Sequence, residues 1–120
     1  MKKFLYLALI FLQVSALGKE FKVENRVNEH LQATVKNNYA EFIKNGSDDF
    51  KKLDKAEFEK VAKQLSPKIK EGMDLMFLTT LNQGPYLVHL FKLSFKNKKE
   101  DALVKIVLGE KNETLGFWIQ

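Results

Sequence analysis

The chain has 120 residues, no cysteine and a formal net charge of +5, from 20 basic and 15 acidic residues. The missing cysteine excludes disulfides, thiol chemistry and cysteine metal sites, and this length suits one domain with a single core. Basic and acidic residues are interleaved over residues 51–63, which is typical of a solvated helix face. A nucleic-acid surface would instead need clustered basic residues with aromatics between them, so nucleic acid is not an expected partner.

The first eighteen residues have the three zones of a cleaved secretory signal peptide. Lys2 and Lys3 give a positive start, residues 4–12 are uncharged and almost wholly apolar, and small residues follow at Ala16 and Gly18. The apolar run is much shorter than the roughly 20 residues that cross a bilayer, so a retained anchor is disfavoured. A buried N-terminal strand or helix is the other alternative.

Cleavage is expected after Gly18, with cleavage after Ala16 as the alternative. Residues 1–18 are then the signal peptide, and residues 19–120 form one secreted or periplasmic domain without a stable membrane anchor. Loss of the two signal lysines lowers the net charge from +5 to +3. Because the chain lacks cysteine in a compartment that permits disulfides, its stability has to come from packing.

The residues after the signal peptide predict helices as far as residue 67. Apolar side chains recur at three- and four-residue steps and indicate one amphipathic helix over residues 20–45. Ser47 is expected to cap a short second helix. Asp54 followed by Glu57 has the form of a capping box for a third helix, which Ser66 and Pro67 are expected to end.

The apolar period then changes from about 3.6 to 2 residues. Four strands are predicted, over residues 69–81, 86–96, 102–108 and 114–119. The links between them are short and have turn chemistry, so neighbouring strands must be antiparallel. The predicted fold class is α+β, with N-terminal helices packed on a curved four-stranded antiparallel meander sheet.

Side-chain alternation predicts two unlike sheet faces. In the second strand, the face that suits the helices carries Leu87, His89, Phe91, Leu93 and Phe95. The candidate binding residues lie on the opposite face: Tyr86, Val88, Leu90 and Trp118. In the last strand, Leu115, Phe117 and Ile119 are expected to oppose Thr114, Gly116, Trp118 and Gln120. An exposed apolar patch usually marks an interaction site, so we expect a ligand or partner there. The alternative is that an N-terminal helix covers this face.

The order of these elements resembles the nuclear-transport-factor-2-like (cystatin-like) superfamily, specifically its small bacterial secreted domains of unknown function. The resemblance rests on Gly-Ser-Asp-Asp-Phe at residues 46–50 and Gly-Phe-Trp-Ile at residues 116–119, and it covers residues 23–120. It implies a cone of curved sheet wrapped around helices, often a homodimer through the open sheet face. Many members bind small molecules in the cone, and a few are enzymes.

Asp74 and His89 are the only candidate catalytic residues. Asp74 lies in the apolar stretch of residues 73–78, and a buried carboxylate has a raised pKa and can serve as a general base. Its alternation away from Met73 and Phe77 would equally place it in solvent. A lone histidine on an apolar strand, such as His89, is more often a core residue than a catalyst.

No metal or cofactor is expected, because His30 and His89 lie on separate elements and no phosphate-binding glycine loop is present. We therefore expect an exported binding domain that holds a small apolar molecule or a protein partner in the cone interior or on the open sheet face. A homodimer through that face is one form of this expectation. The alternative is a small isomerase- or hydrolase-like enzyme with a buried aspartate as general base.

Overall fold

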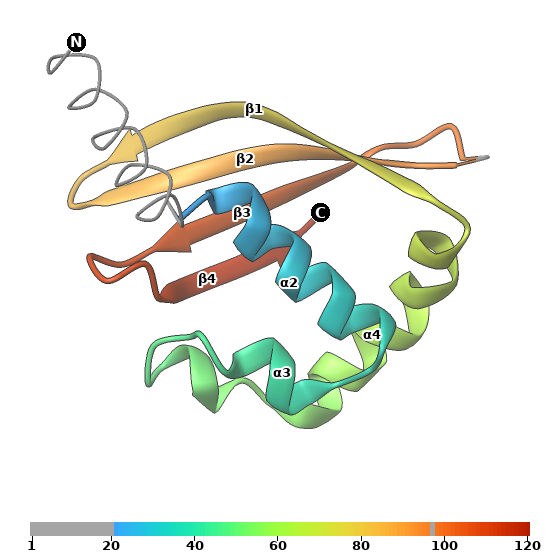
Figure 1. The fold of residues 1–120 in the computed structure, drawn as a ribbon, viewed down its shortest axis with the longest axis horizontal. Coiled ribbons are helices and arrows are strands. Elements are labelled where there is room, and N and C mark those ends of the chain that lie inside the picture. Colours follow the sequence, from blue (N-terminus) through green and yellow to red (C-terminus); the bar gives the residue numbers. More distant parts are fainter. Residues whose placement is uncertain (1–20, 97) are drawn as a thin grey trace, which may run out of the picture.

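A computed structural model describes residues 21–96 and 98–120 and has an α+β fold, as predicted (Figure 1). The helical elements come first: α2 (Val23–Val35), α3 (Tyr39–Ile43), the 3-10 turn η1 (Phe50–Lys52) and α4 (Lys55–Lys70). The strands follow: β1 (Met73–Gln83), β2 (Tyr86–Phe95), β3 (Ala102–Leu108) and β4 (Thr114–Ile119). They form one antiparallel sheet in the order β1-β2-β3-β4, which confirms the predicted meander. The predicted signal peptide, residues 1–18, lies outside the described residues.

The prediction of a single helix over residues 20–45 is wrong, because α2 ends at Val35 and α3 begins at Tyr39. Asn37 has a φ of 52°, a left-handed conformation that asparagine adopts more readily than most residues. The side chain of Asn38 then accepts the backbone N–H of Glu41 at 3.1 Å and caps α3. The apolar period continues across this break, so periodicity alone could not reveal it.

The start of the third predicted helix is confirmed, whereas the second is corrected. Ser47 accepts the backbone N–H of Phe50 at 3.2 Å, but the segment that follows is a single 3-10 turn with Asp49, not Ser47, at its N-cap position. Asp54 accepts the N–H of Glu57 at 3.3 Å and starts α4. That helix continues through Pro67 to Lys70, because its last turn is held by Ile69, which is buried in the core.

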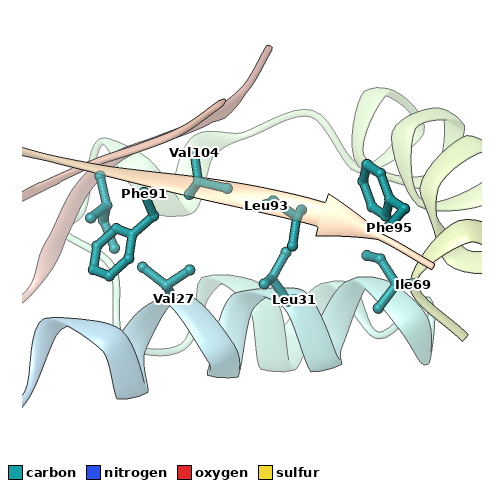
Figure 2. Packing of buried hydrophobic residues seen from close by; sticks show 8 residues of the cluster. Val27, Leu31, Ile69, Phe91, Leu93, Phe95 and Val104 are labelled. Carbon is teal, nitrogen blue, oxygen red and sulfur yellow. The ribbon is translucent and has the colours of Figure 1, made fainter. Parts of the chain in front are cut away.

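The main core lies between α2, the end of α4 and the middle of the sheet (Figure 2). The cluster consists of eight buried residues: Val27, Leu31, Ile69, Phe91, Leu93, Phe95, Val104 and Ile106. Each large side chain fully buried in this way stabilises the fold by about 1.5–3 kcal/mol. All described helices lie on this face of the sheet, so none of them covers the opposite face, here called the outer face (Figure 1). Leu87 shares the helix-facing side but lies beyond the helices and is exposed.

A bulge in β4 changes the predicted alternation of that strand. Leu108 pairs with Thr114 and Val107 with Gly116, so Leu115 is an extra residue in the ladder. Thr114 consequently turns into the protein interior and is completely buried, whereas Leu115 lies on the outer face with Trp118. The predicted grouping of Leu115 with Phe117 is therefore wrong.

Candidate functional site

A hollow of about 410 Å³ lies on the outer face, where β2, β3 and β4 meet the loop before η1. We call it the outer hollow, and its walls are Ser47, Asp49, Gln83, Tyr86, Val88, Lys105, Val107, Leu115, Gly116 and Trp118. Its volume is within the range of sites that hold small molecules. Three of the four predicted binding residues, Tyr86, Val88 and Trp118, are thus brought together. Leu90 lies on the same face, opposite Thr79 and Lys105, but does not line the hollow.

Trp118 is the largest side chain in the walls of this hollow, and the residue is 45% exposed. The ring lies along β4 over Gly116, where a Cβ atom would overlap its carbons, so only glycine leaves room for it. On the neighbouring strand, Lys105 pairs with Trp118 and places its Nζ 4.7 Å from the ring centroid. This is a cation–π contact, which holds both side chains against the sheet.

The charges around the hollow are arranged unevenly. Asp49, on the loop wall, lies 3.5 Å from the Nζ of Lys52. Within the part of the chain that the structure describes, no carboxylate lies within ion-pair distance of Lys105. The ammonium of Lys105 therefore faces the hollow without a compensating charge from those residues.

The loop wall of the hollow is fixed to the edge of β4. Gly46 forms a parallel bridge with Thr114: the N–H of Ser47 donates to the Thr114 carbonyl and the N–H of Thr114 to the Asn45 carbonyl, both at 2.9 Å. Below this bridge, Arg26 of α2 donates to the Asn112 carbonyl at 2.6 Å. A wall held in place before binding reduces the ordering cost that a ligand has to overcome.

His30 of α2 contacts Thr114, the β4 residue of this bridge, from the protein interior. Its Nε2 lies 2.9 Å from Thr114 Oγ1, and its ring is surrounded by Phe42, Phe50 and Phe117. Desolvation, with a further contribution from the positive charge of Arg26, lowers the pKa of His30 to about 4. The imidazole is therefore neutral at physiological pH and structural, and it could not have been assigned to Thr114 from spacing in the sequence.

A second hollow, of about 430 Å³, opens between the helices and β4 and is here called the inner hollow. It is mostly apolar and is lined by Thr34, Phe42, Phe50, Leu53, Glu57, Phe58, Val61, Leu65, Phe117, Trp118 and Ile119. The hydroxyl of Thr34 already donates to the His30 carbonyl at 2.8 Å. Glu57 is the single charged residue among these walls. The inner hollow lies between the helices and the sheet, where the resemblance implies a cone interior, and the cone itself stays a prediction.

Asp74 and His89 do not form a site together. Asp74 is exposed on the outer face, opposite Ser94, so the solvent-facing placement is the one that occurs. His89 lies on the helix-facing side and is only partly buried, with its Nδ1 2.9 Å from Thr80 Oγ1. Desolvation lowers the pKa of His89. Neither residue lines the outer or the inner hollow.

Sequence reasoning missed Lys105, Gly116 and the loop residues Ser47 and Asp49. Lys105 could have been found, because its alternation from Val104 and Ile106 places it on the outer face. Gly116 lies two residues before Trp118, which is the separation at which a large ring can lie over a glycine of the same strand face. No pattern connects residues 47–49 with β4, because that contact depends on the tertiary bridge.

No family model matches the chain, and no curated protein is significantly similar to it. Over residues 21–96 and 98–120, no three side chains among His, Cys, Asp and Glu lie close enough to hold a metal ion. None of the helices in the same residues is long and apolar enough to cross a membrane. The two hollows are therefore the features of the described residues that point to a function.

Proposed function

We propose that this chain is an exported binding domain of nuclear-transport-factor-2-like type, and that it binds a small molecule or a protein partner in the outer hollow. One observation carries the proposal: a half-exposed tryptophan lies over Gly116 with the ammonium of Lys105 against its ring. Core packing does not require such an arrangement, since Trp118 is 45% exposed and belongs to neither core cluster. Tryptophan and tyrosine in this setting are typical of binding surfaces.

The surroundings of the hollow support the same function. Tyr86 is 50% exposed at its rim, and Met76 and Leu81 are exposed apolar residues of β1 on the same face. Apolar groups that remain in water on one face favour a partner that covers them. A second copy of the chain, seated face to face, would bury Tyr86 and Trp118 and is one form of the proposed partner. Export rests on the charge and hydropathy of residues 1–18.

The inner hollow is a second candidate site, for a small apolar molecule. Its walls are chiefly aromatic and aliphatic, and its volume of about 430 Å³ is similar to that of the outer hollow. An enzyme with Asp74 as general base is not favoured, because the proposed chemistry needs a buried carboxylate and Asp74 is exposed.

The experiment compares Trp118→Ser with Leu87→Ser in the purified protein. Both changes remove an exposed apolar side chain, but Leu87 lies on the opposite face of the sheet and outside the hollow. Sedimentation equilibrium measures self-association, and the fluorescence of N-phenyl-1-naphthylamine measures binding of a small apolar molecule. We expect Trp118→Ser to weaken whichever process the wild type shows by at least about tenfold, a loss of about 1.4 kcal/mol, with Leu87→Ser unchanged. If Trp118→Ser behaves like the wild type in both measurements, the assignment of the outer hollow is wrong.

A further inference from the structure

We infer that the outer hollow selects a small molecule with a planar apolar group and an anionic group, such as an aromatic carboxylate. This inference rests on the proposed function and adds the ligand's chemistry to it. Two features of the hollow define the two parts of the ligand: the indole of Trp118 with its apolar floor, and the uncompensated ammonium of Lys105.

The planar group follows from the shape of the indole platform. The Trp118 ring reaches over Gly116 and has the Nζ of Lys105 above it, and its exposed part borders the hollow. Val88, Val107 and Leu115 extend this surface with aliphatic side chains, and none of them offers a hydrogen bond. A flat aromatic group can pack against the exposed part of the indole and cover these side chains at once.

The anionic group follows from the position of Lys105. Its Nζ lies 4.7 Å from the indole centroid, so an anion bound to it would be held next to an aromatic group that packs against the exposed part of Trp118. None of the acidic residues placed in the structure forms an ion pair with Lys105, so a ligand carboxylate would not have to displace a protein one. Lysine binds carboxylate and sulfonate as a compact point charge, which suits an anion of either geometry.

Asp49 favours one orientation of the ligand in the outer hollow. It lies on the loop wall of the same hollow and is paired with Lys52 at 3.5 Å. A ligand anion is attracted toward Lys105 and repelled by Asp49, so only one orientation of the ligand satisfies both charges. The Ser47 hydroxyl accepts the Phe50 N–H and keeps its own hydrogen to donate to the ligand.

The test uses two dyes with the same ring system. N-phenyl-1-naphthylamine is neutral, and 8-anilino-1-naphthalenesulfonate is the same molecule with an added sulfonate. We expect the anionic dye to bind the wild type about tenfold more tightly than the neutral dye, which corresponds to about 1.4 kcal/mol. Lys105→Gln should make the two affinities equal, Lys105→Arg should keep the preference, and Lys111→Gln, in the β3–β4 turn, should leave it unchanged. Raising the salt concentration should weaken the preference in the wild type.

The outcomes separate the two proposals. Equal affinity of both dyes for the wild type, or a preference that neither salt nor Lys105→Gln reduces, overturns the anion inference. If both dyes still lose their binding in Trp118→Ser and in Tyr86→Ala, which changes the outer hollow alone, the proposed function stands without it. If both dyes bind these two variants as well as the wild type, they occupy another site, and both proposals fail. The salt series requires no variant, so it gives a result even if Lys105→Gln does not fold.

Discussion

The two sides of β4 differ in what their side chains do, although one six-residue strand carries both. On the inner side, Thr114 and Phe117 are held against His30 of α2 in a dense aromatic cluster. On the outer side, Leu115 and Trp118 line an open hollow that no helix of residues 21–96 and 98–120 covers. The bulge at Leu115 produces this division, since it turns Thr114 inward without turning Trp118. The difference teaches that aromatic residues next to each other in sequence can have a structural role and, as we propose for Trp118, a binding role.

The largest effect on the free energy of unfolding is expected at Phe91, a buried aromatic residue of β2. The exposed Tyr86 of the same strand serves as the comparison. Phe91 is 2% exposed and packs in the main core, so Phe91→Ala should lower the free energy of unfolding by about 3–5 kcal/mol. Tyr86→Ala, in the outer hollow, should lower it by less than about 1 kcal/mol and should weaken dye binding instead. Urea unfolding measures the first quantity and dye fluorescence the second. Equal destabilisation by the two variants would mean that the outer face belongs to the core.

The next largest effect is a pH dependence that comes from the inner side of β4. His30 has a pKa of about 4 in the folded protein and an ordinary value of 6.5 in the unfolded chain. As the pH falls, His30 therefore takes up a proton in the unfolded chain before it does so in the folded protein. The stability that comes from the neutral, buried His30 is complete above pH 6.5 and is lost as the pH falls toward 4. The loss amounts to about 3 kcal/mol.

Urea unfolding between pH 7.5 and pH 4 measures this effect, with His30→Gln as the test and His89→Gln as the control. His30→Gln should be less stable than the wild type at pH 7.5, because the contact with Thr114 changes, but its stability should fall less steeply below pH 6.5. His89 is only partly buried, so His89→Gln should retain most of the wild-type slope. A wild-type slope in His30→Gln would contradict the assignment of His30 as the buried neutral histidine.

A smaller effect on stability, but a clear one on binding, is expected at the glycine under the indole. In Gly116→Ala the new Cβ overlaps the Trp118 ring, which has to leave its position along β4. We expect a loss of about 1–2 kcal/mol in the free energy of unfolding and a loss of dye binding similar to that in Trp118→Ser. Because the chain has a single tryptophan, a red shift of its emission reports directly that the indole has moved into water. Unchanged emission together with unchanged dye binding would show that Gly116 does not position the ring.

The smallest effect is expected at Asp74. Its carboxylate is exposed on β1 and lies outside both hollows, so Asp74→Asn should change the free energy of unfolding by less than about 0.5 kcal/mol. Dye binding should also remain at the wild-type level. A large loss of binding in this variant would move the functional site from β4 to β1.

Local signals in the sequence predicted much of the fold. The cap at Asp54 and the strand bounds of β3 and β4 follow from residues close together in the chain. The break at Asn37 could not be predicted, because the apolar period continues through it and asparagine only permits the left-handed conformation. The helix end at Pro67 was misplaced because the burial of Ile69 outweighs the hydrogen bond that proline removes.

The site was predicted less completely than the fold, for the same physical reason. Tyr86, Val88 and Trp118 follow from alternation, which is a local property of strands. The contact between His30 and Thr114 joins residues 84 positions apart, and the bulge at Leu115 depends on pairing with β3. The side on which Leu115 lies, and the loop wall at Ser47 and Asp49, could therefore be known only from the folded chain.

The indole N–H signal of Trp118 provides the most direct test of the outer hollow as a binding site. It is the only tryptophan indole in the chain, so it gives one cross-peak in a ¹H–¹⁵N correlation spectrum. During titration with 8-anilino-1-naphthalenesulfonate, we predict that this cross-peak shifts progressively and saturates with the affinity measured from dye fluorescence. A dye that binds while the Trp118 cross-peak stays in place would contradict the assignment of the outer hollow.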